Sequence, residues 1–107
     1  MFKVKRLVTV KPGQKQDLLN KLKNQPISVG IDASDWQFYQ NGILDVRCDG
    51  TEINHSVLLV GYSERGWKLK NSWGPIWGEN GYITIDDPYD DPDPCLITQR
   101  AYYPIMS

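Results

Sequence analysis

Short stretches in which apolar and polar residues alternate, separated by glycine, proline or asparagine, run through most of this sequence. A period of two places one face of each stretch in a core and is typical of β-strands. The continuous apolar run Val57–Val60 further predicts a strand that is buried on both faces. The sequence predicts strands at residues 2–10, 27–31, 43–46, 57–60, 67–70 and 82–85.

One segment has a helical period instead. Between residues 14 and 24, Leu18, Leu19 and Leu22 fall on one face of a helix, and Pro26 ends it. A single amphipathic helix followed by several short strands predicts an α+β fold that is mainly β, with a small antiparallel barrel or sandwich. With 107 residues and no linker-like segment, the chain is predicted to form one domain.

Charge and hydropathy exclude several classes of partner. The formal net charge of −1 provides no basic face for nucleic acid or for an anionic membrane. No apolar run approaches the roughly 20 residues that a membrane-spanning helix needs, so we expect a soluble chain. The acidic, proline-rich residues 86–94 lack the glycine and glutamate spacing of an EF-hand and are predicted to form a solvated loop.

The two cysteines and the single histidine allow few metal sites. Cys48 and Cys95 permit one disulfide, and two buried thiols are an equally good interpretation of the composition. Zinc binding by Cys48, His55 and Cys95 is unattractive, because these are only three ligands without the short spacing of zinc motifs. We therefore expect no metal and no cofactor.

The residues downstream of His55 indicate a functional role for it. Asn71, sixteen residues later, opens a segment that is rich in tryptophan and glycine and ends at Tyr82. The segments Asn54–Tyr62 and Lys70–Tyr82 resemble the motifs around the catalytic histidine and asparagine of papain-like cysteine peptidases of the cathepsin L-like type. Residues 24–29, 38–43 and 95–104 resemble further parts of the same half of that two-domain fold.

The resemblance implies a role for each group. Residues 1–107 would be the right-hand, barrel-like domain, and the left-hand domain with the nucleophilic cysteine would be absent. His55 would act as acid and base on a partner's thiol, Asn71 would orient its ring, and Trp73 would cover their hydrogen bond. Peptide bonds would be hydrolysed through a thioester, and the chain alone is expected to be inactive.

The resemblance also implies a substrate pocket and a disulfide. Arg100 either pairs with an acidic substrate side chain or points to solvent and leaves a hydrophobic pocket. Cys48 and Cys95 fall where the family places a disulfide. The residues expected to contact the substrate are Trp73 and, around a pocket beside the catalytic pair, Gly30, Ile53, Asn54, Ser56 and Arg100.

Three smaller features bear on the same segments. Leu96 and Ser63 stand where the family often has glycine, so the geometry of these loops is expected to differ. The glycosylation pattern Asn54–Ser56 is interpreted as coincidental, since a glycan beside His55 would block the cleft.

Partners and location are further implications of the same resemblance. We expect a complementary cysteine-bearing domain, a peptide or protein substrate, and a propeptide or cystatin-like inhibitor as binders, but no nucleic acid and no membrane. The location is expected to be lysosomal, vacuolar or secreted. The alternative is a non-catalytic, stand-alone or excised domain that binds, regulates or self-associates, as a homodimer or by domain swapping.

Overall fold

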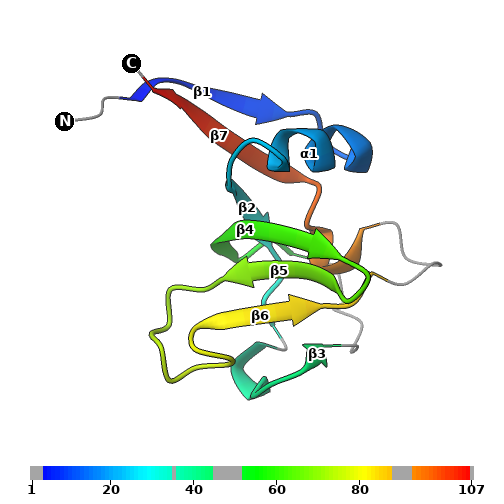
Figure 1. The fold of residues 1–107 in the computed structure, drawn as a ribbon, viewed down its shortest axis with the longest axis vertical. Helices are drawn as coiled ribbons and strands as arrows, with labels where there is room; N and C mark the ends of the chain where they lie inside the picture. Colours follow the sequence, from blue (N-terminus) through cyan, green and yellow to red (C-terminus); the bar gives the residue numbers. More distant parts are fainter. Residues whose placement is uncertain (1–3, 35, 45–51, 88–92, 107) are drawn as a thin grey trace.

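Seven strands form one sheet, in the order β1-β7-β2-β4-β5-β6-β3 (Figure 1). The computed structural model describes residues 4–34, 36–44, 52–87 and 93–106. All neighbouring strands are antiparallel except β3 and β6. The strands are β1 Val4–Val10, β2 Ile27–Ile31, β3 Ile43–Leu44, β4 His55–Ser63, β5 Gly66–Lys70, β6 Tyr82–Ile85 and β7 Arg100–Met106.

One α-helix, α1 Lys15–Leu22, and two short 3₁₀ turns, η1 Trp36–Phe38 and η2 Pro94–Leu96, complete the described part of the chain. Helix α1 buries Leu18 and keeps Leu19 and Leu22 half-buried against the core. The prediction of a mainly β, α+β fold with one amphipathic helix near the N-terminus is confirmed. No helix in the described ranges has the length and apolar character that a membrane span requires.

The sheet is open and does not close into a barrel. Among the described residues, β1 and β3 are the outer strands of the order and do not pair with each other. Figure 1 shows β1, β7 and α1 at one end of the molecule, β5, β6 and β3 toward the other, and β2 and β4 between them. Strand β2 joins the two ends by pairing with β7 on one side and β4 on the other. The barrel-like half implied by the resemblance is thus an open sheet here.

The closing strand β7 was not predicted. It pairs with β1 from Val4↔Met106 to Val10↔Ala101, and with β2 at Gly30↔Arg100. Its sequence hides a regular alternation because Tyr102 and Tyr103 are adjacent and Pro104 lacks a backbone N–H. Strand β7 matters for the site because its first residue, Arg100, lies beside β2.

Strand β4 is longer and less covered than predicted. Val57 and Leu59 are buried, whereas Leu58 and Val60 are only half-buried. One face therefore packs against the core, and the other is only partly covered, with Val60 contributing to a shallow pocket against α1. The prediction of a strand buried on both faces was wrong. A continuous apolar run is typical of parallel strands covered on both faces, whereas β4 is antiparallel and only one of its faces is fully covered.

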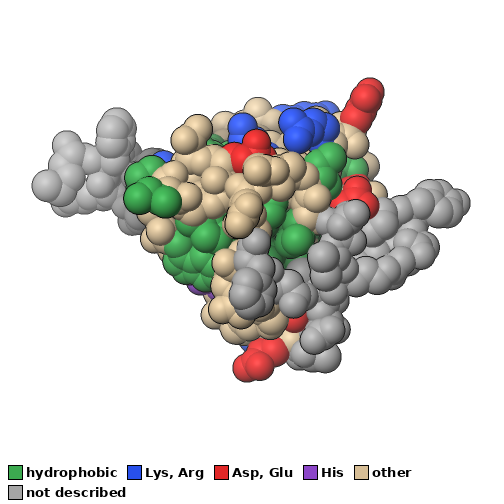
Figure 2. Space-filling view, turned by 90° about the horizontal axis from the view of Figure 1, so that it is seen from below, with side chains coloured by type: hydrophobic (Ala, Val, Ile, Leu, Met, Phe, Trp, Pro, Cys, Tyr) green, Lys and Arg blue, Asp and Glu red, His purple; other side chains and the backbone are tan. Residues whose placement is uncertain are grey.

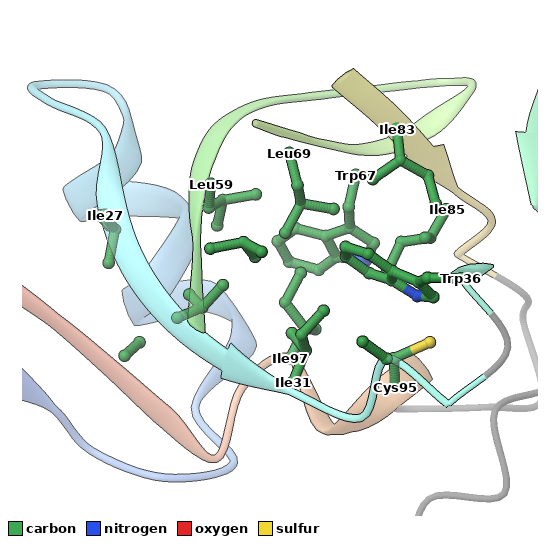
Figure 3. Packing of buried hydrophobic residues seen from close by; sticks show 14 of the residues in the cluster. Ile27, Ile31, Trp36, Leu59, Trp67, Leu69, Ile83, Ile85, Cys95 and Ile97 are labelled. Atoms are coloured by element: carbon green, nitrogen blue, oxygen red, sulfur yellow. The ribbon is translucent and has the colours of Figure 1, made fainter. Parts of the chain in front are cut away.

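The core centres on two tryptophans that are fully buried, Trp36 of η1 and Trp67 of β5 (Figure 3). Isoleucines from several strands surround them, among them Ile31, Ile83 and Ile85. Burial of a large apolar side chain contributes on the order of 1.5–3 kcal/mol, so this cluster dominates the stability of the sheet. The Trp36 carbonyl also accepts the Trp77 indole N–H at 3.1 Å, which ties the loop after β5 to the core.

The acidic segment 86–94 is anchored at its second residue. Asp87 accepts a hydrogen bond from Lys15 at 2.6 Å and another from the Tyr62 hydroxyl, which joins α1, β4 and the end of β6. Partial burial acts to raise the pKa of Asp87, but the bonds from Lys15 and Tyr62 outweigh it and the net pKa is lowered. Residues 88–92 of the predicted solvated loop lie outside the described residues.

Replacement of Asp87 by Asn should destabilise the fold by about 1–2 kcal/mol at pH 7, because it leaves Lys15 without its partly buried partner. A depressed carboxyl pKa gives stability that is present above the usual aspartate pKa and lost as the pH falls through the folded value. Urea unfolding at pH 7 and at pH 3 measures the free energy of unfolding of the native chain and the variant. The difference between them should be smaller at pH 3. The control is Glu64→Gln at an exposed position, which should leave the free energy of unfolding unchanged at both pH values.

Candidate active site

His55 and Asn71 are brought together by the β4–β5 hairpin. Antiparallel pairing places Leu58 opposite Lys70, so the start of β4 lies beside the end of β5. His55 is the first residue of β4, and Asn71 directly follows β5. The imidazole Nε2 lies 2.7 Å from Asn71 Oδ1, and Asn71 is 6% exposed. The structure thus joins the two residues that the sequence nominated as a catalytic pair.

A backbone group fixes the tautomer of His55. The Ser72 N–H donates to Asn71 Oδ1 at 2.7 Å, and a backbone N–H can only donate. The atom that faces it must therefore be the amide oxygen, and the same oxygen faces His55 Nε2. Nε2 must carry a proton to make this bond, which leaves Nδ1 as the ring nitrogen that exchanges a proton with a reacting group.

Trp73 stacks beside the histidine ring. The ring centroids of Trp73 and His55 are 5.1 Å apart with an interplanar angle of 31°. Trp77 meets Trp73 edge-on at 5.2 Å and stacks on Trp36 at 6.0 Å. Trp73 is nevertheless 44% exposed, so its outer side is open to solvent. A series of aromatic contacts therefore holds Trp73 against His55.

A second anchor holds the loop that carries Trp73. The Tyr39 hydroxyl lies 2.5 Å from the Gly42 carbonyl and 3.0 Å from Glu79 Oε2. Burial, and then the hydrogen bond to Glu79, raise the pKa of Tyr39 to about 12. Gly78 has φ +60°, and a Cβ there would lie 2.6 Å from the Tyr82 carbonyl oxygen. The sequence singled out the glycines of this loop but gave no sign of the Tyr39–Glu79 contact.

A pocket of about 380 Å³ opens beside His55. Five of the six residues that the sequence nominated for substrate contact line it, Trp73 does not, and strand β7, which was not predicted, adds Tyr102. Gly30 leaves room for Ile53 in the lining of the pocket, because a Cβ at position 30 would lie 2.9 Å from Ile53 Cγ2. The complete lining is Gly30, Ile53, Asn54, His55, Ser56, Arg100 and Tyr102.

Asn54 has a structural task as well as a place in this pocket. Its Oδ1 accepts the Ala33 N–H at 3.0 Å, and its Nδ2 donates to Ser34 Oγ at 3.3 Å. The side chain therefore fastens the turn after β2 to the entry of β4. This use of both ends of the amide was not apparent from the sequence.

Both departures from the family's glycines have a local explanation. Leu96 has φ +62°, so it adopts the left-handed conformation that glycine tolerates best, next to Cys95 at φ +54°. Ser63 Oγ accepts the Arg65 N–H at 3.2 Å, which closes the β4–β5 turn in a way that glycine cannot. Leu96 thus holds a glycine-like backbone conformation under strain, Ser63 adds a hydrogen bond, and the predicted difference in loop geometry stays a prediction.

The predicted disulfide and the zinc alternative involve Cys48, which lies outside the described residues. Cys95 is buried in the core at 5% exposure. Within the described ranges, no three His, Cys, Asp or Glu side chains cluster as metal ligands. The Cys48–Cys95 bond therefore stays a prediction.

Comparisons with known proteins support the resemblance found in the sequence. The family profile described as "Papain family cysteine protease" matches residues 1–105. A KDEL-tailed cysteine endopeptidase, CEP2, of Arabidopsis thaliana is 53% identical over 95 residues, which cover 82% of this chain and 26% of that protein. Papaya proteinase 4 of Carica papaya is 42% identical over 105 residues, covering 92% of this chain and 30% of its own length. The chain thus spans under a third of these curated relatives.

Solved structures show the same fold. The Carica candamarcensis cysteine protease CMS1MS2, in complex with E-64, superposes with a TM-score of 0.86 at 32% identity, over 95% of this chain and 49% of that one. The proform of the ragweed pollen cysteine protease Amb a 11 gives 0.84 at 35% identity, over 98% of this chain and 34% of that one. The matched part is thus half or less of each solved chain.

Proposed function

Because the chain belongs to the papain family of cysteine proteases, we propose that it supplies the histidine and asparagine of a cysteine endopeptidase site. The observation that carries the proposal is the 2.7 Å contact from His55 Nε2 to an Asn71 oxygen whose orientation is set by the Ser72 N–H. Trp73 covers the ring from one side. An imidazole held in one tautomer is the group that a thiol nucleophile requires.

The proposed chemistry runs through His55 Nδ1. This nitrogen takes the proton of a cysteine thiol, and the thiolate attacks the scissile carbonyl while the imidazolium stays bonded to Asn71. Nδ1–H then protonates the leaving amine as the C–N bond breaks, which leaves a thioester. Water, deprotonated by Nδ1, hydrolyses the thioester and restores the thiol. The oxyanion hole belongs to the domain that carries the cysteine.

We propose that the nucleophile comes from a complementary cysteine-bearing domain. Cys95 is buried in the core and Cys48 is assigned to the predicted disulfide, so neither is offered as the nucleophile. Figure 2 shows hydrophobic side chains gathered on one face of the molecule. Trp73, which is 44% exposed, lies against His55. A partner docked over Trp73 and His55 would bring its thiol to Nδ1 and bury apolar surface.

Relatives suggest the other binders and the location. Two matched structures are complexes with the inhibitor E-64, and another is a proform, which suggests such an inhibitor and a propeptide as occupants of the completed cleft. The pocket beside His55 would hold a substrate side chain. The KDEL-tailed relative supports a vacuolar or secreted location, where the Cys48–Cys95 disulfide would be stable.

Reconstitution tests the proposal. The 107-residue chain and a separately produced cysteine-bearing domain should each cleave no peptide, and their mixture should release amine from a blocked peptide amide in an E-64-sensitive reaction. The rate should rise with partner concentration until the chain is saturated. Thiol-dependent turnover by the chain alone, or a bound but inactive pair, would contradict the proposal.

Self-association is the second candidate, because Ile76 is 96% exposed in the loop that carries Trp73. An apolar side chain displayed this fully favours a contact with another surface. Light scattering of the isolated chain over a range of concentrations tests this candidate. A monomer at all concentrations, for both the native chain and Ile76→Ser, would exclude the self-associating function.

A further inference from the structure

Three neighbouring strands place one charged residue, Arg100, in a row with Gly30 and Ser56 beside His55. Gly30 of β2 pairs with Arg100 of β7 on one side and with Ser56 of β4 on the other. Residues directly opposite each other in adjacent strands point to the same face of a sheet. His55 is the neighbour of Ser56 in β4, and both lie on the rim of the 380 Å³ pocket. The row therefore forms one wall of a cavity within reach of the proposed catalytic ring.

The aliphatic part of the Arg100 side chain packs against Gly30, where no side chain is present. A Cβ at Gly30 would lie 3.4 Å from Arg100 Cβ and 3.8 Å from Arg100 Cδ, so the aliphatic part of the arginine passes over the glycine backbone. This packing fixes the base of the side chain, and because Arg100 is exposed, its charged end is open to a ligand. A Cβ at position 30 would also lie 2.9 Å from Ile53 Cγ2, so a larger residue there would clash with the pocket lining.

The charge of Arg100 has no internal partner in the described ranges. The ion pair found there joins Lys15 to Asp87 and does not involve Arg100. None of the pocket-lining residues is acidic, whereas Ser56 and Tyr102 add hydroxyl groups. A guanidinium beside hydroxyl donors is complementary to a carboxylate, to which arginine binds through two parallel N–H···O bonds.

We propose that this pocket selects an acidic residue of the peptide, with the carboxylate bound by Arg100. The inference rests on the proposed function, because the peptide is the substrate of the site that contains His55. It adds a specificity that family membership does not supply: glutamate or aspartate at the residue that enters the pocket, in preference to their amides and to leucine.

A binding experiment without catalysis tests the inference. Blocked peptides that differ only at the pocket residue, as Glu, Gln, Leu or Lys, are titrated into the ¹⁵N-labelled 107-residue chain at low salt. A fifth peptide has leucine there and a free C-terminal carboxylate. The Glu peptide should bind about tenfold more tightly than the Gln peptide, which corresponds to about 1.4 kcal/mol. The largest shift changes should fall on the amides of Gly30, Ser56 and Arg100.

Variants at Arg100 separate charge from packing. Arg100→Gln keeps the stem as far as Cδ and should remove the Glu preference, whereas Arg100→Glu should favour the Lys peptide. Lys23→Gln changes an exposed cation at the end of α1 and should leave the Glu preference intact.

Four results would overturn the inference. These are equal affinity for the Glu and Gln peptides, no measurable binding of the Glu peptide, a Glu preference that survives Arg100→Gln, and equally tight binding of the peptide with the free C-terminus. Binding needs no cysteine, so failure of the reconstituted cleavage would leave this result interpretable.

Discussion

The reconstituted two-domain enzyme should lose peptide hydrolysis by about 10⁴-fold when His55 is replaced by Ala, measured as kcat/KM with a blocked peptide amide. The loss reflects the proposed double role of the ring, which takes the thiol proton and returns it to the leaving amine. Neither step has a substitute in the described part of the chain, since the neighbours Asn71 and Trp73 carry no titratable group in the neutral range.

The matched control for this variant is Arg65→Ala, in the exposed turn between β4 and β5. It should keep full activity in the same assay. His55 is half-buried and its ring makes one hydrogen bond, so both variants should unfold close to the wild-type midpoint. A His55→Ala enzyme that keeps more than about a tenth of the wild-type kcat/KM would exclude the proposed role of this ring.

Replacement of Asn71 by Ala should lower kcat/KM of the reconstituted enzyme by about 100-fold, the usual upper range for a residue that orients a functional histidine. Asn71 is a positioning residue, because its Oδ1 acts on His55 and not on the substrate. Without this acceptor the imidazolium loses a stabilising bond, so the alkaline limb of the pH–rate profile should move to lower pH.

Asn71→Asp distinguishes positioning from support of the fold. A carboxylate keeps an acceptor for His55 and for the Ser72 N–H and adds a negative charge that stabilises the imidazolium. Its alkaline limb should therefore move to higher pH, and its activity should exceed that of Asn71→Ala. Identical pH profiles for the two variants would show that Asn71 only supports the loop.

The sequence predicted those parts of the fold in which local pattern and tertiary environment agree. The alternation at Ile27–Ile31 and Tyr82–Ile85 reflects one buried face, and both strands have the predicted bounds. Helix α1 was predicted from its leucine face and is shorter by one to two residues at each end. Strand β7 was missed because its two adjacent tyrosines and its proline break the pattern.

The candidate site was only partly predictable. His55, Asn71 and Trp73 were nominated by resemblance, and so were the five predicted residues of the pocket. The Tyr39–Glu79 contact joins residues 40 positions apart, and the position of Arg100 over Gly30 depends on pairing between β2 and β7. Such features depend on strand order, which no local pattern encodes.

The ring nitrogens of His55 provide the most direct test of the central claim. Nitrogen-15 NMR of the labelled 107-residue chain, at a pH where the ring is neutral, reports which nitrogen carries the proton. The bond from Nε2 to Asn71 Oδ1 predicts a protonated Nε2 and an unprotonated Nδ1. A protonated Nδ1, or the averaged signals of a freely exchanging imidazole, would contradict the account.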